Sequence, residues 1–313
     1  MATDVLAGLI HLNLAAAGAI LVVMALRETA RRSFGAEIAY GLWICVPIAA
    51  AAALLPAAAA TRIYPPGVEP HFDPIFLASQ ALDQSPSKAL LAIWLLGVTL
   101  GILTVARRQS HFLRMARRGL AGPAVTGFFA PRIIMPADAD RLYSTEERAL
   151  IRAHERTHID RGDPRTNGFI AFAQCLFWFN PMVHLASHTA RLDQELACDA
   201  AVLAHRSGQK RLYAATLLKT QIGGVATPLG CHWLAGAAPH PLEQRIRALR
   251  GPALDDRRRD TGLFAIGLAL ALAALGAWRA QPAGAAQGMP PPTPPPVEIE
   301  HHMQAIIVTP IFR

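Results

Sequence analysis

Apolar residues in this chain gather in long stretches rather than in short alternating runs. Four stretches approach the roughly 20 residues that a helix needs to cross the hydrocarbon core of a bilayer: residues 5–26, 36–60, 89–106 and 261–277. The second contains Pro47 and Pro56, which a membrane helix tolerates when its neighbours satisfy the freed backbone groups. The pattern therefore predicts a mainly α-helical integral membrane protein with four transmembrane helices.

Composition and charge fit this prediction. The chain is 52% hydrophobic and 17% charged, with a mean hydropathy of +0.28, which places it on the apolar side of soluble proteins. A net charge of +8 is also typical of nucleic-acid binders, but here the arginines cluster beside the apolar stretches and do not interleave with aromatic residues. We therefore expect a lipid bilayer as a partner and no direct contact with nucleic acid.

The arginines also predict an orientation. Clusters follow the first and third stretches and precede the fourth, whereas the loop between the second and third holds only Arg62, with Lys88 at its edge. The positive-inside rule then puts both termini outside and the long central segment in the cytosol. With no basic residue before it, the first stretch is expected to be a retained anchor and not a cleaved signal peptide. We expect a multi-pass protein of the inner (cytoplasmic) membrane, divided into residues 1–106 (three transmembrane helices), 107–260 (cytosolic domain), 261–280 (fourth transmembrane helix) and 281–313 (a Pro-rich extracytoplasmic tail).

A fifth apolar stretch, residues 169–186, is nearly as apolar as a span. If it crossed the membrane, His158 and Glu195 would lie on opposite sides. A buried or membrane-skimming helix, broken near Asn180 and Pro181, is the more economical prediction.

The chemistry centres on the sequence HERTH at residues 154–158. On a helix, positions i and i+4 share a face, so His154 and His158 can reach one metal ion, and Glu155 between them can act as a general base. Ser144 and Glu147 predict a capping box that starts this helix, which should end near Gly162. The competing interpretation of so short a motif is an exposed helix face with two unremarkable histidines.

A third ligand is expected downstream, because hydrolytic zinc sites usually keep three protein ligands and one open position. Glu195 and Asp199 lie one turn apart on a predicted helix. Glu195 can ligate, while Asp199 can accept the N–H of a ligating histidine. We assign a similar supporting role to Asp163, shortly after the motif. The alternative is that Glu195 only solvates its helix or pairs with Arg191.

Two further features bear on this site. Residues 124–127 and 131–136, joined through a turn, predict a β-hairpin before the helix that carries the motif. Four widely spaced cysteines form no CxxC pair, which indicates reduced thiols and neither disulfides nor a cysteine zinc site.

Three motifs in order resemble those of the BlaR/MecR-type membrane metallopeptidases: HERTHIDRGD from residue 154, WFNP from residue 178 and ELACD from residue 195. The layout of three spans, a cytosolic domain and a final span is similar as well. This resemblance implies an α+β gluzincin-type domain, a zinc ion held by His154, His158 and Glu195, and Glu155 as general base. In gluzincin folds an edge strand at the place of the predicted hairpin pairs with the substrate backbone, which makes Ile133 and Ile134 candidates for that pairing; a purely structural hairpin is equally compatible. It also implies regulated cleavage of a cytosolic transcriptional repressor or of the protein itself.

The C-terminal region departs from that family. Well-known members carry a penicillin-binding sensor after the last span, whereas this chain has a Pro-rich tail without serine, so β-lactam sensing is not expected. Besides signalling by proteolysis, two functions stay open: a quality-control peptidase for membrane proteins, and a non-catalytic adaptor acting through its tail. The sequence also leaves open a homodimer.

Overall fold

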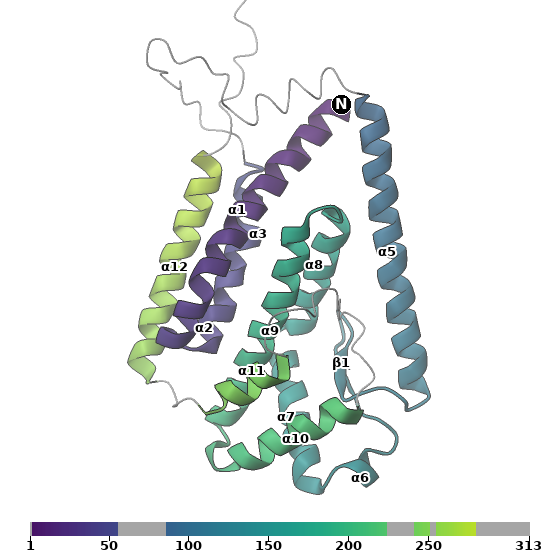
Figure 1. The fold of residues 1–313 in the computed structure, drawn as a ribbon, viewed down its shortest axis with the longest axis vertical. Coiled ribbons are helices and arrows are strands. Elements are labelled where there is room, and N and C mark those ends of the chain that lie inside the picture. The colour runs from purple at the N-terminus through teal and green to yellow at the C-terminus, as the bar shows by residue number, and fades with distance from the viewer. Residues whose placement is uncertain (1, 56–85, 224–240, 251–254, 280–313) are drawn as a thin grey trace, which may run out of the picture.

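A computed structural model describes residues 2–55, 86–223, 241–250 and 255–279 of the chain (Figure 1). Helices dominate this part, with one small hairpin. In chain order the elements are α1 (Ala2–Phe34), α2 (Ala36–Gly41), η1 (Leu42–Ile44), α3 (Cys45–Ala52), α5 (Ser87–Arg117), β1 (Ala124–Thr126), β2 (Arg132–Ile134), α6 (Ala139–Leu142), α7 (Thr145–Asp160), α8 (Asp163–Leu176), α9 (Pro181–Ala204), η3 (Ser207–Gln209), α10 (Lys210–Gly223), α11 (Pro241–Ala248) and α12 (Asp256–Arg279).

Three of the four expected spans are long, apolar helices. By length and composition, α1, α5 and α12 can each cross a membrane. The second stretch is divided into α2, η1 and α3 and forms a shorter apolar segment over Ala36–Ala52. Its expected continuation through residues 56–60 lies outside the described residues, so a fourth crossing stays a prediction, as do the expectations for Cys231 and the tail from residue 281.

The N-terminal helices and α12 form a bundle (Figure 1). Gly35, with φ of 95°, reverses the chain between α1 and α2 in a backbone conformation that side chains disfavour. Val23, Leu42 and Cys45 are buried there, against Ile266 and its neighbours on α12. Close packing of apolar helices through small residues is typical of membrane proteins.

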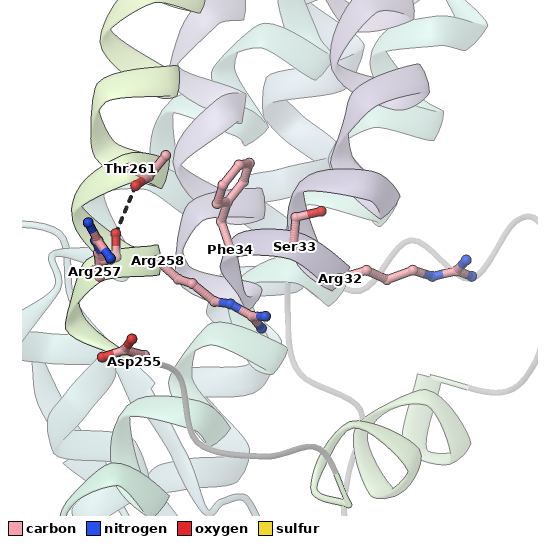
Figure 2. Close-up of a pocket in the computed structure, with 7 residues that line it drawn as sticks. All are labelled: Arg32, Ser33, Phe34, Asp255, Arg257, Arg258 and Thr261. Atoms are coloured by element: carbon pink, nitrogen blue, oxygen red, sulfur yellow. Dashed lines mark hydrogen bonds between the residues drawn. The ribbon is translucent and has the colours of Figure 1, made fainter.

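A pocket of about 600 Å³ opens at one end of this bundle (Figure 2). It is lined by Arg32, Ser33, Phe34, Asp255, Arg257, Arg258 and Thr261. Its arginines belong to the clusters that the positive-inside rule predicts to be cytosolic. None of the lining residues belongs to the HERTH motif or its neighbours.

The fifth apolar stretch folds into a helical hairpin. Helix α8 ends at Leu176, and α9 begins at Pro181 after Asn180, whose side chain accepts a hydrogen bond from the Met182 amide at 2.8 Å. The predicted helix break is therefore confirmed. Because the chain turns back, the start of α8 and the second half of α9 lie near each other, and Asp163 is brought to the same region as Glu195.

Helix α7 holds the HERTH motif rigidly. The predicted capping box is present, with the Ser144 and Glu147 side chains bonding each other's backbone N–H groups. Leu150 of α7 packs in a buried cluster with Val202 of α9 and with Tyr213 and Leu217 of α10. This cluster fixes α7 against α9 and so sets the distance between the two helices that carry the expected ligands.

The predicted hairpin is also confirmed. Strands β1 and β2 pair antiparallel, with Val125 opposite Ile133 and Ala124 opposite Ile134. Both strands contact α7. Among the described residues the sheet has only these two strands, so each strand keeps one edge that no other described strand occupies.

Candidate metal centre

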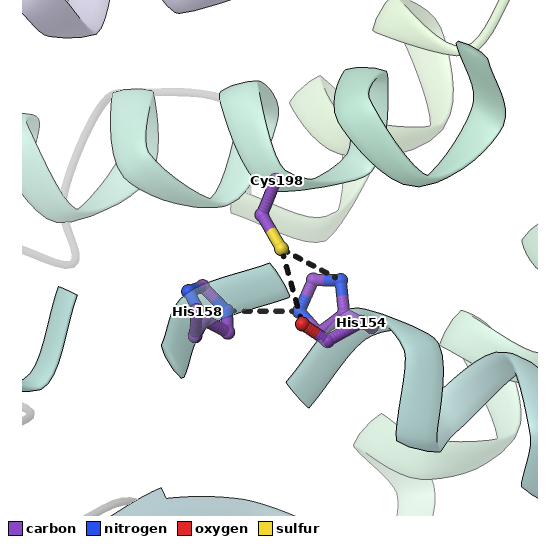
Figure 3. A group of neighbouring side chains, drawn as sticks. All are labelled: His154, His158 and Cys198. Atoms are coloured by element: carbon purple, nitrogen blue, oxygen red, sulfur yellow. Dashed lines mark hydrogen bonds between the residues drawn. The ribbon is translucent and has the colours of Figure 1, made fainter. Parts of the chain in front are cut away.

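Two histidines from α7 meet at a single point (Figure 3). Their Nε2 atoms lie 3.1 Å apart, and their rings cross at 89° with centroids 4.7 Å apart. Both residues are buried, at 9% and 8% exposure. The i and i+4 spacing therefore gives a converging pair of donors, and the exposed helix face that competed with this interpretation is not what the structure shows.

Glu195 of α9 completes a set of three donors. Its carboxylate oxygens lie 3.3 Å from His154 Nε2 and 3.5 Å from His158 Nε2. Zinc bonds of about 2.0–2.1 Å to nitrogen and oxygen at tetrahedral angles require ligand atoms roughly 3.3–3.4 Å apart. The observed separations bracket this value, so the donor set fits a zinc ion. The Glu195 side chain is 33% exposed, which leaves the centre accessible on that side.

Cys198 also touches the histidines, and a His154–His158–Cys198 group is compact enough to hold a metal (Figure 3). However, its Sγ atom lies 3.4 Å from His154 Nδ1 and 3.3 Å from the His154 carbonyl oxygen. Nδ1 is the nitrogen on the other side of the ring from Nε2. The two Nε2 atoms and the Glu195 carboxylate have the separations that suit zinc, and the Cys198 sulfur lies within 4.8 Å of a nitrogen of each histidine.

Hydrogen bonds to the Nδ1 atoms orient both histidines. Asp163 lies 2.7 Å from His158 Nδ1 and is 1% exposed. Tyr213 lies 2.8 Å from His154 Nδ1 and donates its own proton to Asp199 at 2.7 Å. Because the phenol donates to Asp199, its oxygen accepts from His154 Nδ1–H. Each ring thereby directs its Nε2 lone pair to the shared point. Asp199 acts mainly through Tyr213, although its carboxylate is also 3.4 Å from Nδ1.

Arg245 is a site residue that the sequence did not reveal. It comes from α11 and is 6% exposed. Its guanidinium donates to both oxygens of Asp199, at 2.8 and 2.7 Å, and lies 3.0 Å from a Glu195 oxygen. It thus holds two acidic residues of α9, one turn apart, in fixed orientations. No pattern in the sequence separates it from the exposed Arg247.

The charges in the cluster shift one another's pKa values. Burial alone would lower the pKa of His154, but Cys198 and Glu195 raise it to about 10. Burial would raise the pKa of Glu195, yet Arg245 and the two histidines hold it well below its ordinary value. Glu195 is therefore an anion ready to ligate a cation, and a metal ion competes with protons for the histidines.

Glu155 is buried beside this cluster, at 8% exposure. Burial raises its pKa, while the nearby histidines oppose the shift. A carboxylate with a raised pKa is suited to accept a proton and pass it on.

A polar network joins the centre to the N-terminal helices. Tyr40 of α2 donates to Asp163 at 3.2 Å and accepts from Gln194 at 2.8 Å. Asp193, also on α9, accepts from Arg27 at 2.7 Å and from Trp43 at 2.9 Å. No sequence pattern indicates these contacts, because the bonded residues lie more than 100 positions apart in the chain.

Not every expected contact appears among the described residues. Ile133 and Ile134 are half-buried on β2, which packs on α7, and their role towards a substrate stays a prediction. Arg191, the alternative partner of Glu195, donates to Gln174 at 3.4 Å.

Two comparisons with known proteins found matches to the sequence of this chain. The family model described as "BlaR1 peptidase M56" matches residues 7–249. A curated protein, "Regulatory protein BlaR1" of Bacillus licheniformis, is 34% identical over 84 residues, which cover 27% of this chain and 14% of that protein. No solved structure matches the chain.

Proposed function

The chain belongs to the BlaR1 peptidase M56 family, as its motifs predicted, and on that basis we propose that it is a membrane-bound zinc endopeptidase. The observation that carries the proposal is the convergence of His154, His158 and Glu195 at separations that suit zinc. These three residues would hold the ion, which supplies a Lewis acid for the scissile carbonyl.

The remaining residues of the centre have separate roles. Glu155 takes a proton from the attacking water and delivers it to the leaving amine. Asp163 and Tyr213 keep the two imidazoles in the tautomer that presents Nε2. Arg245 fixes Asp199 and Glu195. Its guanidinium therefore holds the Glu195 carboxylate in place before a metal ion binds.

The hairpin supplies a place for the substrate. An extended peptide can add to a strand edge through main-chain hydrogen bonds, which demands little of its sequence. We assign this role to β2, with the backbone groups of Ile133 and Ile134 pairing with the added segment, because β2 packs directly on the helix that carries His154 and Glu155.

Residues 107–260 would form this α+β catalytic domain on the cytosolic side of the inner membrane, with spans over residues 1–106 and 261–280. The arginine clusters support that orientation. A cytosolic regulator of the repressor type, or the protein itself, is then the substrate within reach. Direct hydrogen bonds from Tyr40 and Trp43 to α8 and α9 provide a route by which membrane helices can influence cleavage.

The test is Glu155→Gln, with Glu146→Gln as a matched control on the exposed first turn of the same helix. We expect about one zinc per chain in both variants and in the parent. Cleavage is detected as new protein N-termini, mapped by mass spectrometry in cells that produce each variant, and includes any cleavage within this chain. These N-termini should be lost with Glu155→Gln and kept with Glu146→Gln. Undiminished cleavage by metal-free parent protein contradicts the proposal.

A further inference from the structure

The hairpin of α8 and α9 exposes large apolar side chains that a water-facing surface would not favour. Phe169, Phe172 and Phe179 are 65%, 59% and 49% exposed. Trp178, at the turn between the helices, is 39% exposed. Several large apolar side chains exposed on one hairpin indicate contact with a membrane or another apolar partner.

The neighbours of the hairpin identify which partner this is. In Figure 1 the loop between α8 and α9 lies between α1 and α5, two helices that can cross a membrane. On one side, Trp94 of α5 donates to the Leu176 carbonyl at 2.9 Å. On the other, Asn180 donates to Asn13 of α1 at 2.7 Å.

Two glycines show how closely α5 and the hairpin pack. A Cβ atom added to Gly97 would lie 2.1 Å from the Trp178 ring, and one added to Gly101 would lie 3.3 Å from the Cys175 sulfur. The α5 backbone therefore approaches the hairpin through glycines, as helices do inside membranes.

We propose that α8 and α9 form a re-entrant hairpin that enters the bilayer from the cytosolic side, between α1 and α5, and turns within the hydrocarbon core. The proposal rests on the membrane orientation given above. Its ligand is the acyl-chain region of the bilayer, contacted by the exposed aromatic side chains of α8 and of the turn.

The contacts on α1 and α5 give the depth independently. Asn13 precedes the first basic residue of α1, Arg27, by 14 positions, and Trp94 precedes Arg107 by 13. At a rise of 1.5 Å per residue, these spacings correspond to about 21 and about 20 Å. The hydrocarbon core is about 30 Å thick, so both helices place the turn roughly two-thirds of the way through it.

Several polar groups of the turn find partners within the protein, which lipid surroundings favour. The Asn180 amide oxygen accepts from the Met182 N–H while its nitrogen donates to Asn13. Trp94 satisfies the Leu176 carbonyl, and His184 Nε2 lies 3.0 Å from the Trp178 carbonyl. These bonds reduce the cost of placing the turn in hydrocarbon.

The other end of the hairpin then lies at the membrane surface. Asp193, two positions before Glu195, pairs with Arg27 and Arg31, where α1 becomes basic. The hairpin thus anchors the metal centre at the cytosolic boundary of the bilayer, within reach of substrate segments that lie against the membrane.

Spin-label accessibility tests the proposal on the full chain in phosphatidylcholine–phosphatidylglycerol vesicles. Single cysteines replace Phe179, Phe172 or Phe169 on the hairpin. Leu96 of α5 and Phe264 of α12 are exposed on the spans and serve as lipid controls, and the exposed Arg156 of α7 is the aqueous control. The unsubstituted chain gives the background from its four native cysteines, of which Cys45, Cys175 and Cys198 are buried.

The ratio of collisions with oxygen to collisions with a water-soluble nickel chelate reports depth. We expect the ratio for Phe179→Cys to match that for Leu96→Cys. The ratio should be lower for Phe169→Cys and lowest for Arg156→Cys. A low ratio at Phe179→Cys with high ratios at both span controls overturns the hairpin but not the orientation. Low ratios at the span controls overturn the membrane orientation itself. Few collisions with either reagent at Phe179→Cys mean that protein covers the turn, which also overturns the proposal.

Discussion

Asp163 offers the sharpest test of the metal centre, because it touches a proposed ligand without being one. Its carboxylate lies 2.7 Å from His158 Nδ1 and is almost fully buried. Removing it leaves the imidazole free to rotate and to place its proton on Nε2, where the proton blocks ligation. We expect zinc to bind more weakly to Asp163→Ala and Asp163→Asn.

The size of the loss follows from the contact. Removing such a partner of a metal-binding histidine costs about 10- to 100-fold in metal affinity, which is about 1.4–2.7 kcal/mol. Asp163→Asn keeps an acceptor oxygen but loses the charge, so it should fall near the tenfold end. Asp163→Ala removes the acceptor and should fall near the 100-fold end. Tyr40→Phe, which removes one donor to Asp163, should have a smaller effect.

Competition with a chromophoric zinc chelator measures these affinities on purified protein. Asp160→Asn is the matched control, because it removes the same charge from an exposed position on α7. Its affinity should stay within about twofold of the parent, as a surface charge contributes little. Thermal melting of each metal-free variant checks that it is folded. An Asp163→Ala protein that is folded and binds zinc as tightly as the parent refutes the assignment of His158.

Three further outcomes are expected. Arg245→Met leaves buried Asp199 without its strongest partner and should destabilise the protein by about 3–5 kcal/mol in chemical denaturation, whereas exposed Arg247→Met should stay within about 0.5 kcal/mol; equal losses contradict the buried pair. Without metal, the pKa of His154 is raised from 6.5 to about 10. The protonated imidazole therefore stabilises the metal-free protein, fully below pH 6.5, and this contribution is lost as the pH rises through about 10. Apparent zinc affinity should rise over the same window in a chelator titration, because bound protons must leave, and a flat profile refutes the coupling. Ser144→Ala removes the α7 cap and should lower the free energy of unfolding by about 1 kcal/mol, measured by denaturant titration; an unchanged midpoint shows that the cap does not limit stability.

Local spacing made much of the protein predictable. Long apolar stretches predicted α1, α5 and α12, because a helix must be about 20 residues long to cross a bilayer. The i and i+4 spacing of His154 and His158 placed both rings on one helix face, and Pro181 marked the start of α9. These features depend on neighbours within a few turns, which the sequence displays directly.

Tertiary packing decided the rest of the metal centre. Tyr213 and Arg245 reach the site from α10 and α11, and Tyr40 reaches Asp163 across 123 positions. In the sequence, Arg245 is one of several arginines near a membrane segment. Whether such a side chain is solvated or buried against Asp199 depends on which helices pack together, and no local pattern records that.

The α8–α9 hairpin shows both contributions. Its sequence determined that an apolar segment would break at Asn180 and Pro181, because proline cannot continue the preceding helix. Its position between α1 and α5, and the return of Glu195 to within 3.5 Å of both histidines, came from contacts between residues far apart in the chain. Ligand separations of a few tenths of an ångström are set by the packing of whole helices, and only the assembled structure contains that information.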